Sequence, residues 1–286
     1  MKVKYYNVAG HVFALETENG DDAEIVLGQY EPFVCDATDD VAFRLLICAA
    51  PLKTDGFILE VKQDDEGQDI LAGHVDGQPC FQFSLREKLM GVLICSTDYR
   101  LGKLYAEDYN QFGINNALMV MYALATADKR TALFHSSVVS YEGKGYMFLG
   151  PSGTGKSTHS KLWLKYIEGT KLVNDDNPVV RVLNDGTVNV YGSPWSGKTP
   201  CYRNVSYPVG GIVMLHQAPE NIIRRLRPLE AYASLMASIS GKRWDGRLAE
   251  GLHETENLLV ANISIWRLDC LPDEGAARLC NDTIAK

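Results

Sequence analysis

A glycine-rich segment carries the clearest chemical pattern of the sequence. Residues 150–157 read Gly-Pro-Ser-Gly-Thr-Gly-Lys-Ser, which fits the G-x-x-x-x-G-K-[ST] pattern of a phosphate-binding loop. Glycines let backbone N–H groups wrap a phosphate, and the N-terminus of a following helix adds partial positive charge. The pattern predicts that a nucleoside triphosphate, or another polyphosphate, contacts Gly150, Ser152, Gly153, Thr154, Gly155, Lys156, Ser157 and Thr158.

An aspartate pair follows the loop and could supply the rest of a phosphate-transfer site. Lys156 would neutralise the β- and γ-phosphates, and the Ser157 hydroxyl would ligate Mg²⁺. Asp175 and Asp176 close a short predicted strand that we expect beside the loop strand. One carboxylate can hold Mg²⁺ and the other can accept a proton from an attacking hydroxyl, in either order. The alternative is a simple turn, which Pro178 favours.

Two histidines and one glycine-containing segment lie near these residues in the sequence. His135 is expected on a strand beside the loop strand, where a lone histidine is most often a core residue. His159 follows the loop, and we expect it at the surface. The segment 191–203 contains Trp195 between two glycines. It is either a mobile lid over the phosphate or a surface loop with a packed tryptophan.

Three short motifs together resemble the HPr kinase/phosphorylase family and the related ATP-dependent phosphoenolpyruvate carboxykinases. They are Phe-His-Ser-Ser-Val at 134–138, the glycine-rich loop, and Leu-Val-Asn-Asp-Asp at 172–176. The similarity covers roughly residues 130–216 and does not extend to residues 1–107. The resemblance implies an active site that contains His135, Lys156, Ser157, Asp175 and Asp176, with one aspartate on the metal and one accepting a serine proton.

The resemblance also implies a cation that holds the transferred phosphate. The segment 203–208 is similar to a carboxykinase motif, which makes Arg203 the first candidate and Lys198 the second. Two departures separate the chain from the carboxykinases, which are nearly twice as long and carry a metal-binding lysine before the histidine. The corresponding stretch here, 112–122, has no lysine or arginine. Since Ser136 also replaces a family glycine, the chain resembles an HPr-kinase-like relative rather than the regulatory kinase itself.

The elements that must position these residues change in type near residue 108. Residues 1–108 alternate short apolar runs with Gly, Asp and Asn clusters, which predicts an acidic, β-rich N-terminal domain with hairpins. Residues 109–286 mix helical spacing with strands, including two strands joined by a turn at 142–145. The predicted fold class is therefore α/β, with a P-loop-containing mixed sheet and flanking helices in this second, nucleotide-binding domain.

Charge and composition exclude several classes of partner. The net charge of −8 combines −11 in residues 1–110 (9 basic, 20 acidic) with +3 in residues 111–286 (19 basic, 16 acidic). An acidic protein of this kind lacks the positive field that binding to nucleic acid or an anionic membrane requires. The seven cysteines form no C-x-x-C motif and fit a reducing compartment. With no apolar run of signal-peptide or membrane-span length, a cytoplasmic location is predicted.

The sequence thus predicts an ATP- and Mg²⁺-dependent phosphotransferase. The acceptor would be a hydroxyl group of a protein, a peptide or a small molecule, and the serine hydroxyl is the first candidate. A carboxykinase-like activity and a non-catalytic nucleotide-sensing module are the alternatives. The identity of the acceptor, reverse phosphorolysis and the oligomeric state, including a homo-oligomer, stay open.

Overall fold

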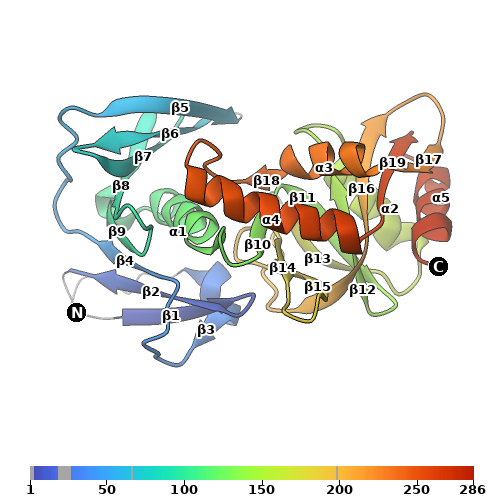
Figure 1. The fold of residues 1–286 in the computed structure, drawn as a ribbon, viewed down its shortest axis with the longest axis horizontal. Coiled ribbons are helices and arrows are strands. Elements are labelled where there is room, and N and C mark those ends of the chain that lie inside the picture. The colour runs from blue at the N-terminus through green and yellow to red at the C-terminus, as the bar shows by residue number, and fades with distance from the viewer. Residues whose placement is uncertain (1–2, 19–26, 66, 198) are drawn as a thin grey trace. The chain divides into compact units, whose positions relative to one another are not determined.

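The computed structural model describes residues 3–18, 27–65, 67–197 and 199–286 (Figure 1). It shows a mixed α/β protein with two large sheets and few helices. The chain divides into two compact units, Met1–Thr126 and Ala127–Lys286. The division thus follows helix α1 (Gln111–Thr126), whereas the sequence prediction placed it before this helix, between residues 108 and 109.

Unit 1 contains a nine-stranded sheet with the order β3-β1-β2-β4-β9-β8-β7-β6-β5. Tight turns with left-handed residues, such as Asp76-Gly77, connect the antiparallel strands, as the Gly and Asp clusters predicted. The elements are β1 (Val3–Val8), β2 (His11–Thr17), η1 (Gly28–Phe33), β3 (Val34–Cys35), β4 (Phe43–Ile47), β5 (Ile58–Asp65), β6 (Gln68–Val75), β7 (Gln78–Leu85), β8 (Lys88–Cys95), β9 (Leu101–Tyr105) and η2 (Glu107–Tyr109).

Helix α1 belongs to unit 1 because its apolar side chains pack on that sheet. It contacts β4, β7, β8 and β9 and buries Ile114, Leu118 and Met121. The carboxamide of Asn110 caps the helix start, accepting from the Gly113 N–H at 2.8 Å and donating to a β8 carbonyl. A helix that is apolar on most sides must be covered by protein on most sides, which accounts for the position of the boundary.

Unit 2 is built on a ten-stranded sheet, in which eight strands follow the order β13-β11-β12-β16-β15-β14-β10-β18 and β17 and β19 lie off this path. The long strand β16 pairs with β15 at its start and with β12 and β19 further on. The strands are β10 (Thr131–Phe134), β11 (Ser136–Tyr141), β12 (Lys144–Leu149), β13 (Lys171–Asp176), β14 (Val179–Val182), β15 (Val188–Tyr191), β16 (Ser206–Gln217), β17 (Ile222–Arg225), β18 (Ile239–Ser240) and β19 (Ile265–Cys270). The helices are α2 (Lys156–Tyr166), α3 (Pro228–Met236), α4 (Gly246–Asn262) and α5 (Glu274–Ile284).

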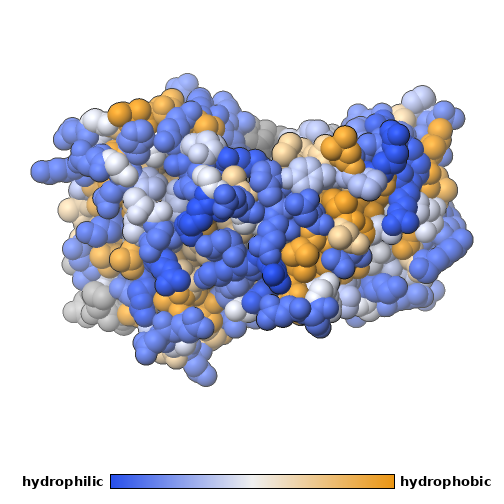
Figure 2. Space-filling model, in the orientation of Figure 1, coloured by the Kyte–Doolittle hydropathy of each residue, from blue (hydrophilic) through white to orange (hydrophobic). Residues whose placement is uncertain are grey.

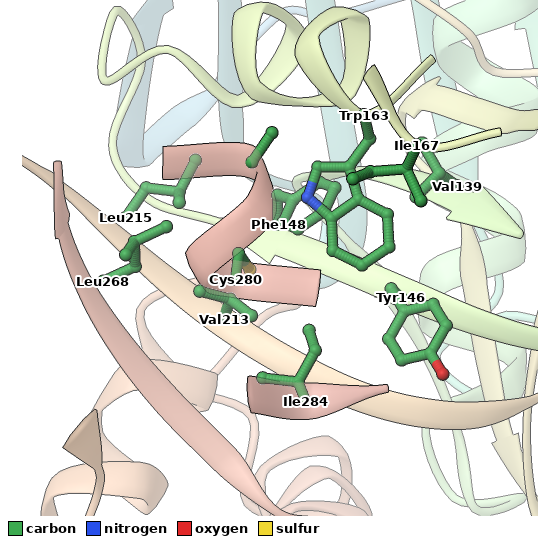
Figure 3. Packing of buried hydrophobic residues seen from close by; sticks show 11 residues of the cluster. Val139, Tyr146, Phe148, Trp163, Ile167, Val213, Leu215, Leu268, Cys280 and Ile284 are labelled. Atoms are coloured by element: carbon green, nitrogen blue, oxygen red, sulfur yellow. The ribbon is translucent and has the colours of Figure 1, made fainter. Parts of the chain in front are cut away.

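The core of unit 2 fixes α2 against the sheet. Trp163 of α2 is fully buried, and its ring centroid lies 5.5 Å from that of Phe148 on β12 (Figure 3). Cys280 and Ile284 of α5 and Val213 of β16 complete the same cluster. Because burial of each large side chain contributes about 2 kcal/mol, this cluster holds α2 at a defined place against the sheet.

The surface of the face seen in Figure 2 is mostly hydrophilic, with smaller apolar groups between the polar residues. Such scattered apolar exposure is ordinary for a folded protein. None of the helices in the part of the chain that the structure describes has the length and hydropathy needed to cross a lipid bilayer.

A buried carboxylate joins α4 to the end of α3. Glu256 is fully buried and accepts a hydrogen bond from Arg243 at 2.6 Å. Arg243 also donates to the Met236 carbonyl at 3.0 Å, and the His253 Nδ1 lies 3.3 Å from the second Glu256 oxygen. Removing one partner of a buried ion pair leaves an uncompensated charge, so this network is expected to be sensitive to substitution.

We expect Glu256→Ala to lower the free energy of unfolding of unit 2 by about 3 kcal/mol, because Arg243 keeps its charge but loses its carboxylate partner. All four tryptophans lie in unit 2, so urea denaturation followed by tryptophan fluorescence reports on this unit. Glu254→Ala is the matched control, because Glu254 lies on the same helix as Glu256 but forms an exposed ion pair with Arg130. Its substitution should lower the free energy of unfolding by less than about 1 kcal/mol. Equal losses in the two variants would contradict the prediction.

Candidate active site

The glycine-rich loop connects β12 to α2, as the sequence predicted. Three of its glycines have backbone φ angles that L-residues rarely adopt, 150° at Gly150, 77° at Gly153 and 106° at Gly155. A Cβ at Gly150 would also lie 3.1 Å from the side chain of Thr154. The loop conformation therefore depends on glycine at these positions.

The side chain of Lys156 folds back over the loop. Its Nζ donates to the carbonyl oxygens of Gly150 at 2.9 Å and Pro151 at 3.2 Å. On the other side, the Gln217 amide at the end of β16 donates to the Gly153 carbonyl at 3.2 Å. Gln217 was not found from the sequence, because only the parallel pairing of β12 and β16 brings it to the loop.

The sequence predicts the strand of the aspartate pair directly beside the loop strand. The structure corrects this prediction, because one strand lies between them. β13 pairs with β11, and β11 pairs with β12. The reason is the two-residue turn Glu142-Gly143, in which both φ angles are positive and which folds β11 back along β12. β11 therefore occupies the position next to the loop strand β12, and β13 lies one strand further out.

The pair nevertheless lies level with the start of the loop. Asp176 is opposite Ser136 on β11, and Ser136 is opposite Leu149 at the end of β12. Gly150 follows Leu149 directly. Since neighbouring strands lie about 4.8 Å apart, the backbone of Asp176 is about 10 Å from that of the loop strand. A triphosphate on the loop would span this separation.

The two aspartates point to opposite faces of β13, because side chains alternate along a strand. Asp175 faces α2, where it is buried and accepts a hydrogen bond from Ser137 at 2.6 Å. The Ser137 hydroxyl also lies 2.6 Å from that of Ser160 on α2. On the other face, the His135 Nδ1 lies 3.3 Å from Asp176 Oδ1. From the sequence, either aspartate could be the metal ligand or the proton acceptor. In the structure, the surroundings of the two carboxylates differ.

The His135–Asp176 pair is open to solvent. His135 lies in the short link between β10 and β11 rather than within a strand, and its side chain is 38% exposed. The Asp176 side chain is 33% exposed. The His135 N–H donates to the Ser238 carbonyl at 2.7 Å, which fixes the backbone of this link. A reacting group can therefore reach both side chains.

The segment around Trp195 packs against the acid pair. Trp195 is 2% exposed. This burial agrees with the interpretation of the segment as a loop with a packed tryptophan. A Cβ at Gly197 would lie 3.1 Å from Asp176 Cβ, so a glycine allows the chain to pass close to this carboxylate. Gly197 was not among the predicted site residues. Lys198, the predicted second phosphate clamp, lies outside the residues that the structure describes.

Arg203 lies at the other end of β13. Its Nη1 donates to the Leu172 carbonyl at 2.6 Å. Four residues of an extended strand separate Leu172 from Asp176, about 13 Å of chain. The structure thus does not bring Arg203 to the acid pair, and its role as a phosphate clamp stays a prediction.

His159 is buried, which corrects the expectation that it lies at the surface. It is 3% exposed, its ring stands edge-on to Phe148 at 4.7 Å, and its Nε2 accepts a hydrogen bond from Trp163 at 3.2 Å. Burial lowers the pKa of this imidazole to about 4. The missed signal was its spacing of four residues from Trp163, which places both side chains on the buried face of α2.

We expect acid to destabilise unit 2 through His159. Its unfolded pKa is about 6.5, so between pH 6.5 and 4 the unfolded chain binds a proton that the folded chain does not. The stability is unaffected above pH 6.5 and falls by about 2 kcal/mol at pH 5 from this group. Urea denaturation at pH 7.5 and 5 measures it. His159→Gln keeps an acceptor for Trp163 without titrating and should lose less stability, whereas an identical loss would contradict the assignment.

The oxygen donors beside the start of α2 suit Mg²⁺. The Ser157 hydroxyl lies on the first turn, and the buried Asp175 is linked to this helix through Ser137 and Ser160. Mg²⁺ usually takes only one or two protein oxygens together with phosphate oxygens and water. The described residues contain no group of three or more His, Cys, Asp or Glu side chains that could hold a metal. Ser157 and Asp175 could therefore hold Mg²⁺ only together with phosphate oxygens and water.

Fold and site define a mixed α/β protein with a glycine-rich loop between a sheet strand and a helix. The family model described as "SynChlorMet cassette protein ScmC" matches residues 94–264, more than half of the chain, which therefore belongs to this family. No curated protein matches the sequence. The structure of the Hpr(Ser) kinase/phosphatase from Coxiella burnetii is distantly similar, with 11% identity over 54% of this chain and 93% of that chain, and a TM-score of 0.32.

Proposed function

We propose that the chain is an ATP- and Mg²⁺-dependent phosphotransferase, which transfers the γ-phosphate to a hydroxyl group. The hydroxyl of a serine is the first candidate for the acceptor. The observation that carries the proposal is the division of the acid pair between the two faces of β13, level with the start of the loop. Asp175 faces the helix that follows the loop, and Asp176 faces His135. One carboxylate is thereby available to a metal and the other to a hydroxyl.

The nucleotide would bind to the loop through backbone N–H groups and Lys156. Lys156 would exchange its contacts with the Gly150 and Pro151 carbonyls for contacts with phosphate oxygens. Ser157 and Asp175 would hold Mg²⁺, which neutralises the β- and γ-phosphates when bound. This assignment uses the buried aspartate as a ligand and leaves the exposed aspartate for the reaction.

Asp176 would act as the general base. The acceptor oxygen forms a bond with the γ-phosphorus, the bond between that phosphorus and the oxygen of the ADP leaving group breaks, and the acceptor proton moves to the Asp176 carboxylate. His135 would donate from Nδ1 to the same carboxylate and orient it. The half-exposed position of both side chains supports this role, since an acceptor must reach them.

The test is transfer of label from ATP labelled at the γ-phosphate, with Mg²⁺ present, into a lysate of the cells that encode the protein. A labelled protein, peptide or metabolite that depends on the added chain is the expected result, and its identity gives the acceptor class. Nucleotide binding by calorimetry runs in parallel. Binding of ATP without transfer to any acceptor, with only slow hydrolysis, would overturn the proposal in favour of a nucleotide-sensing module.

A further inference from the structure

A buried asparagine connects the acid pair to the segment that packs against it. Asn174 precedes the pair on β13 and is 0% exposed. Its Nδ2 lies 3.1 Å from Ser193 Oγ and 3.3 Å from the Trp195 carbonyl. Its Oδ1 accepts from the Asp176 N–H at 3.0 Å. One carboxamide therefore joins the backbone of Asp176 to residues about twenty positions further along the chain.

A second set of contacts closes the connection on the far side of the pair. Ser193 is fully buried, and its Oγ donates to the Asn177 carbonyl at 2.5 Å. The Asn177 N–H donates to the Trp195 carbonyl at 3.1 Å. The segment 193–195 is thus held by residues on both sides of Asp175–Asp176. We name the side chains and backbone groups of Asn174, Asn177, Ser193 and Trp195 the Asn174 hub.

The hub determines what lies next to Asp176. Two residues beyond Trp195, Gly197 approaches Asp176 so closely that a Cβ there would be 3.2 Å from the carboxyl carbon. His135 lies on the same carboxylate at 3.3 Å. The Asp176 side chain therefore sits between an imidazole and a backbone segment whose position depends on Asn174.

We infer that Asn174 is a positioning residue for Asp176, holding its backbone and the segment 193–197 in the arrangement that leaves the carboxylate facing His135 and the acceptor. The inference rests on the proposed function for the part that concerns catalysis. The chemistry requires a carboxamide at this position. An ionised aspartate introduced by Asn174→Asp could accept from the Asp176 N–H, but it would turn a carboxylate oxygen toward the carbonyls of Trp195 and Ser193, which lie 3.3 Å and 3.5 Å from Asn174 Nδ2. A group of the same shape would thus lose the donor and gain repulsion.

The first test does not need activity. In Asn174→Asp, amide hydrogen exchange measured by mass spectrometry should become at least about 10-fold faster in peptides that cover 175–177 and 193–197, since repulsion between the new carboxylate and the Trp195 carbonyl makes the hub open more often. Peptides over β12 and α2 should not change. Asn177→Asp is the matched control: it adds the same charge three residues away, at a residue that contributes only its backbone N–H and carbonyl to the hub contacts described above, and it should leave the exchange of these peptides unchanged. Unchanged exchange in Asn174→Asp would overturn the inference.

The second test measures transfer. Asn174→Asp should lower kcat about 100-fold, because small displacements of a reacting group have effects of this size, while the Kd for ATP stays within about 2-fold. If Asn174→Asp does not fold, Ser193→Ala replaces it in this test. Ser193→Ala removes the hub hydroxyl without adding charge, and it should also lower kcat. Faster exchange with unchanged kcat would overturn the positioning role. Faster exchange with no transfer by the wild-type chain would overturn the proposed function and leave the hub in place.

Discussion

Asp176→Asn is expected to abolish phosphate transfer while ATP still binds. The substitution keeps the shape of the side chain and its contact with His135 but removes the group that takes the acceptor proton. A general base contributes about 10²- to 10⁴-fold to a rate, so transfer should fall by at least about 100-fold. The Kd for ATP should stay within about 2-fold, because Asp176 lies on the face of β13 away from α2. Initial rates of label transfer and calorimetry measure the two quantities.

Asp175→Asn is the internal control for this prediction. It makes the same chemical change one residue earlier, on the other face of the strand. If Asp175 is the metal ligand, this variant should need a higher Mg²⁺ concentration to reach half-maximal rate, whereas Asp176→Asn should not. Transfer by Asp176→Asn at the wild-type rate would contradict the base assignment, and a shift of the Mg²⁺ dependence in that variant alone would exchange the two roles.

Lys156→Ala is expected to weaken ATP binding about 10- to 100-fold. A hydrogen bond to a charged group contributes about 1.5–3 kcal/mol, and this lysine is the cation that would contact the phosphates in the proposed function. Calorimetric titration with ATP and Mg²⁺ measures the change. The loss should be smaller for AMP, which lacks the β- and γ-phosphates.

Lys161→Ala is the matched control, since this lysine lies exposed on the same helix. It removes the same charge about one turn further from the loop and should leave the Kd within about 2-fold. Similar affinities of the wild-type chain and Lys156→Ala for ATP would mean that the loop does not bind the phosphates in the manner proposed.

The glycine-rich loop could be predicted from the sequence because its requirements are local. Gly150, Gly153 and Gly155 adopt φ angles that only glycine adopts readily, and the flanking apolar run and helix pattern lie within a few residues. The turn at Glu142-Gly143 was predicted for the same reason. Local sterics thus gave the strand, the loop and the helix in the correct order.

Features that depend on pairing between distant segments could not be predicted in this way. The position of β13 beside β11, the contact of Gln217 with the loop and the contact of Gly197 with Asp176 all arise from residues tens of positions apart. The apolar spacing over α1 indicated a helix, but not the sheet on which it packs. His159 is a different case, because its four-residue spacing from Trp163 was a local signal of burial that was missed, and only its contact with Phe148 comes from another element.

The fold of Lys156 over its own loop also affects which ligands the loop can accept. The Nζ already has two carbonyl partners, at 2.9 Å from Gly150 and 3.2 Å from Pro151. A ligand gains from entering only if its oxygens attract an ammonium group more strongly than two neutral carbonyls do. A multiply charged phosphate chain meets this condition, whereas neutral or singly charged solutes gain little. If the loop binds phosphate as proposed, we therefore expect it to favour multiply charged solutes over neutral ones, because a ligand must replace the two backbone carbonyls at Lys156.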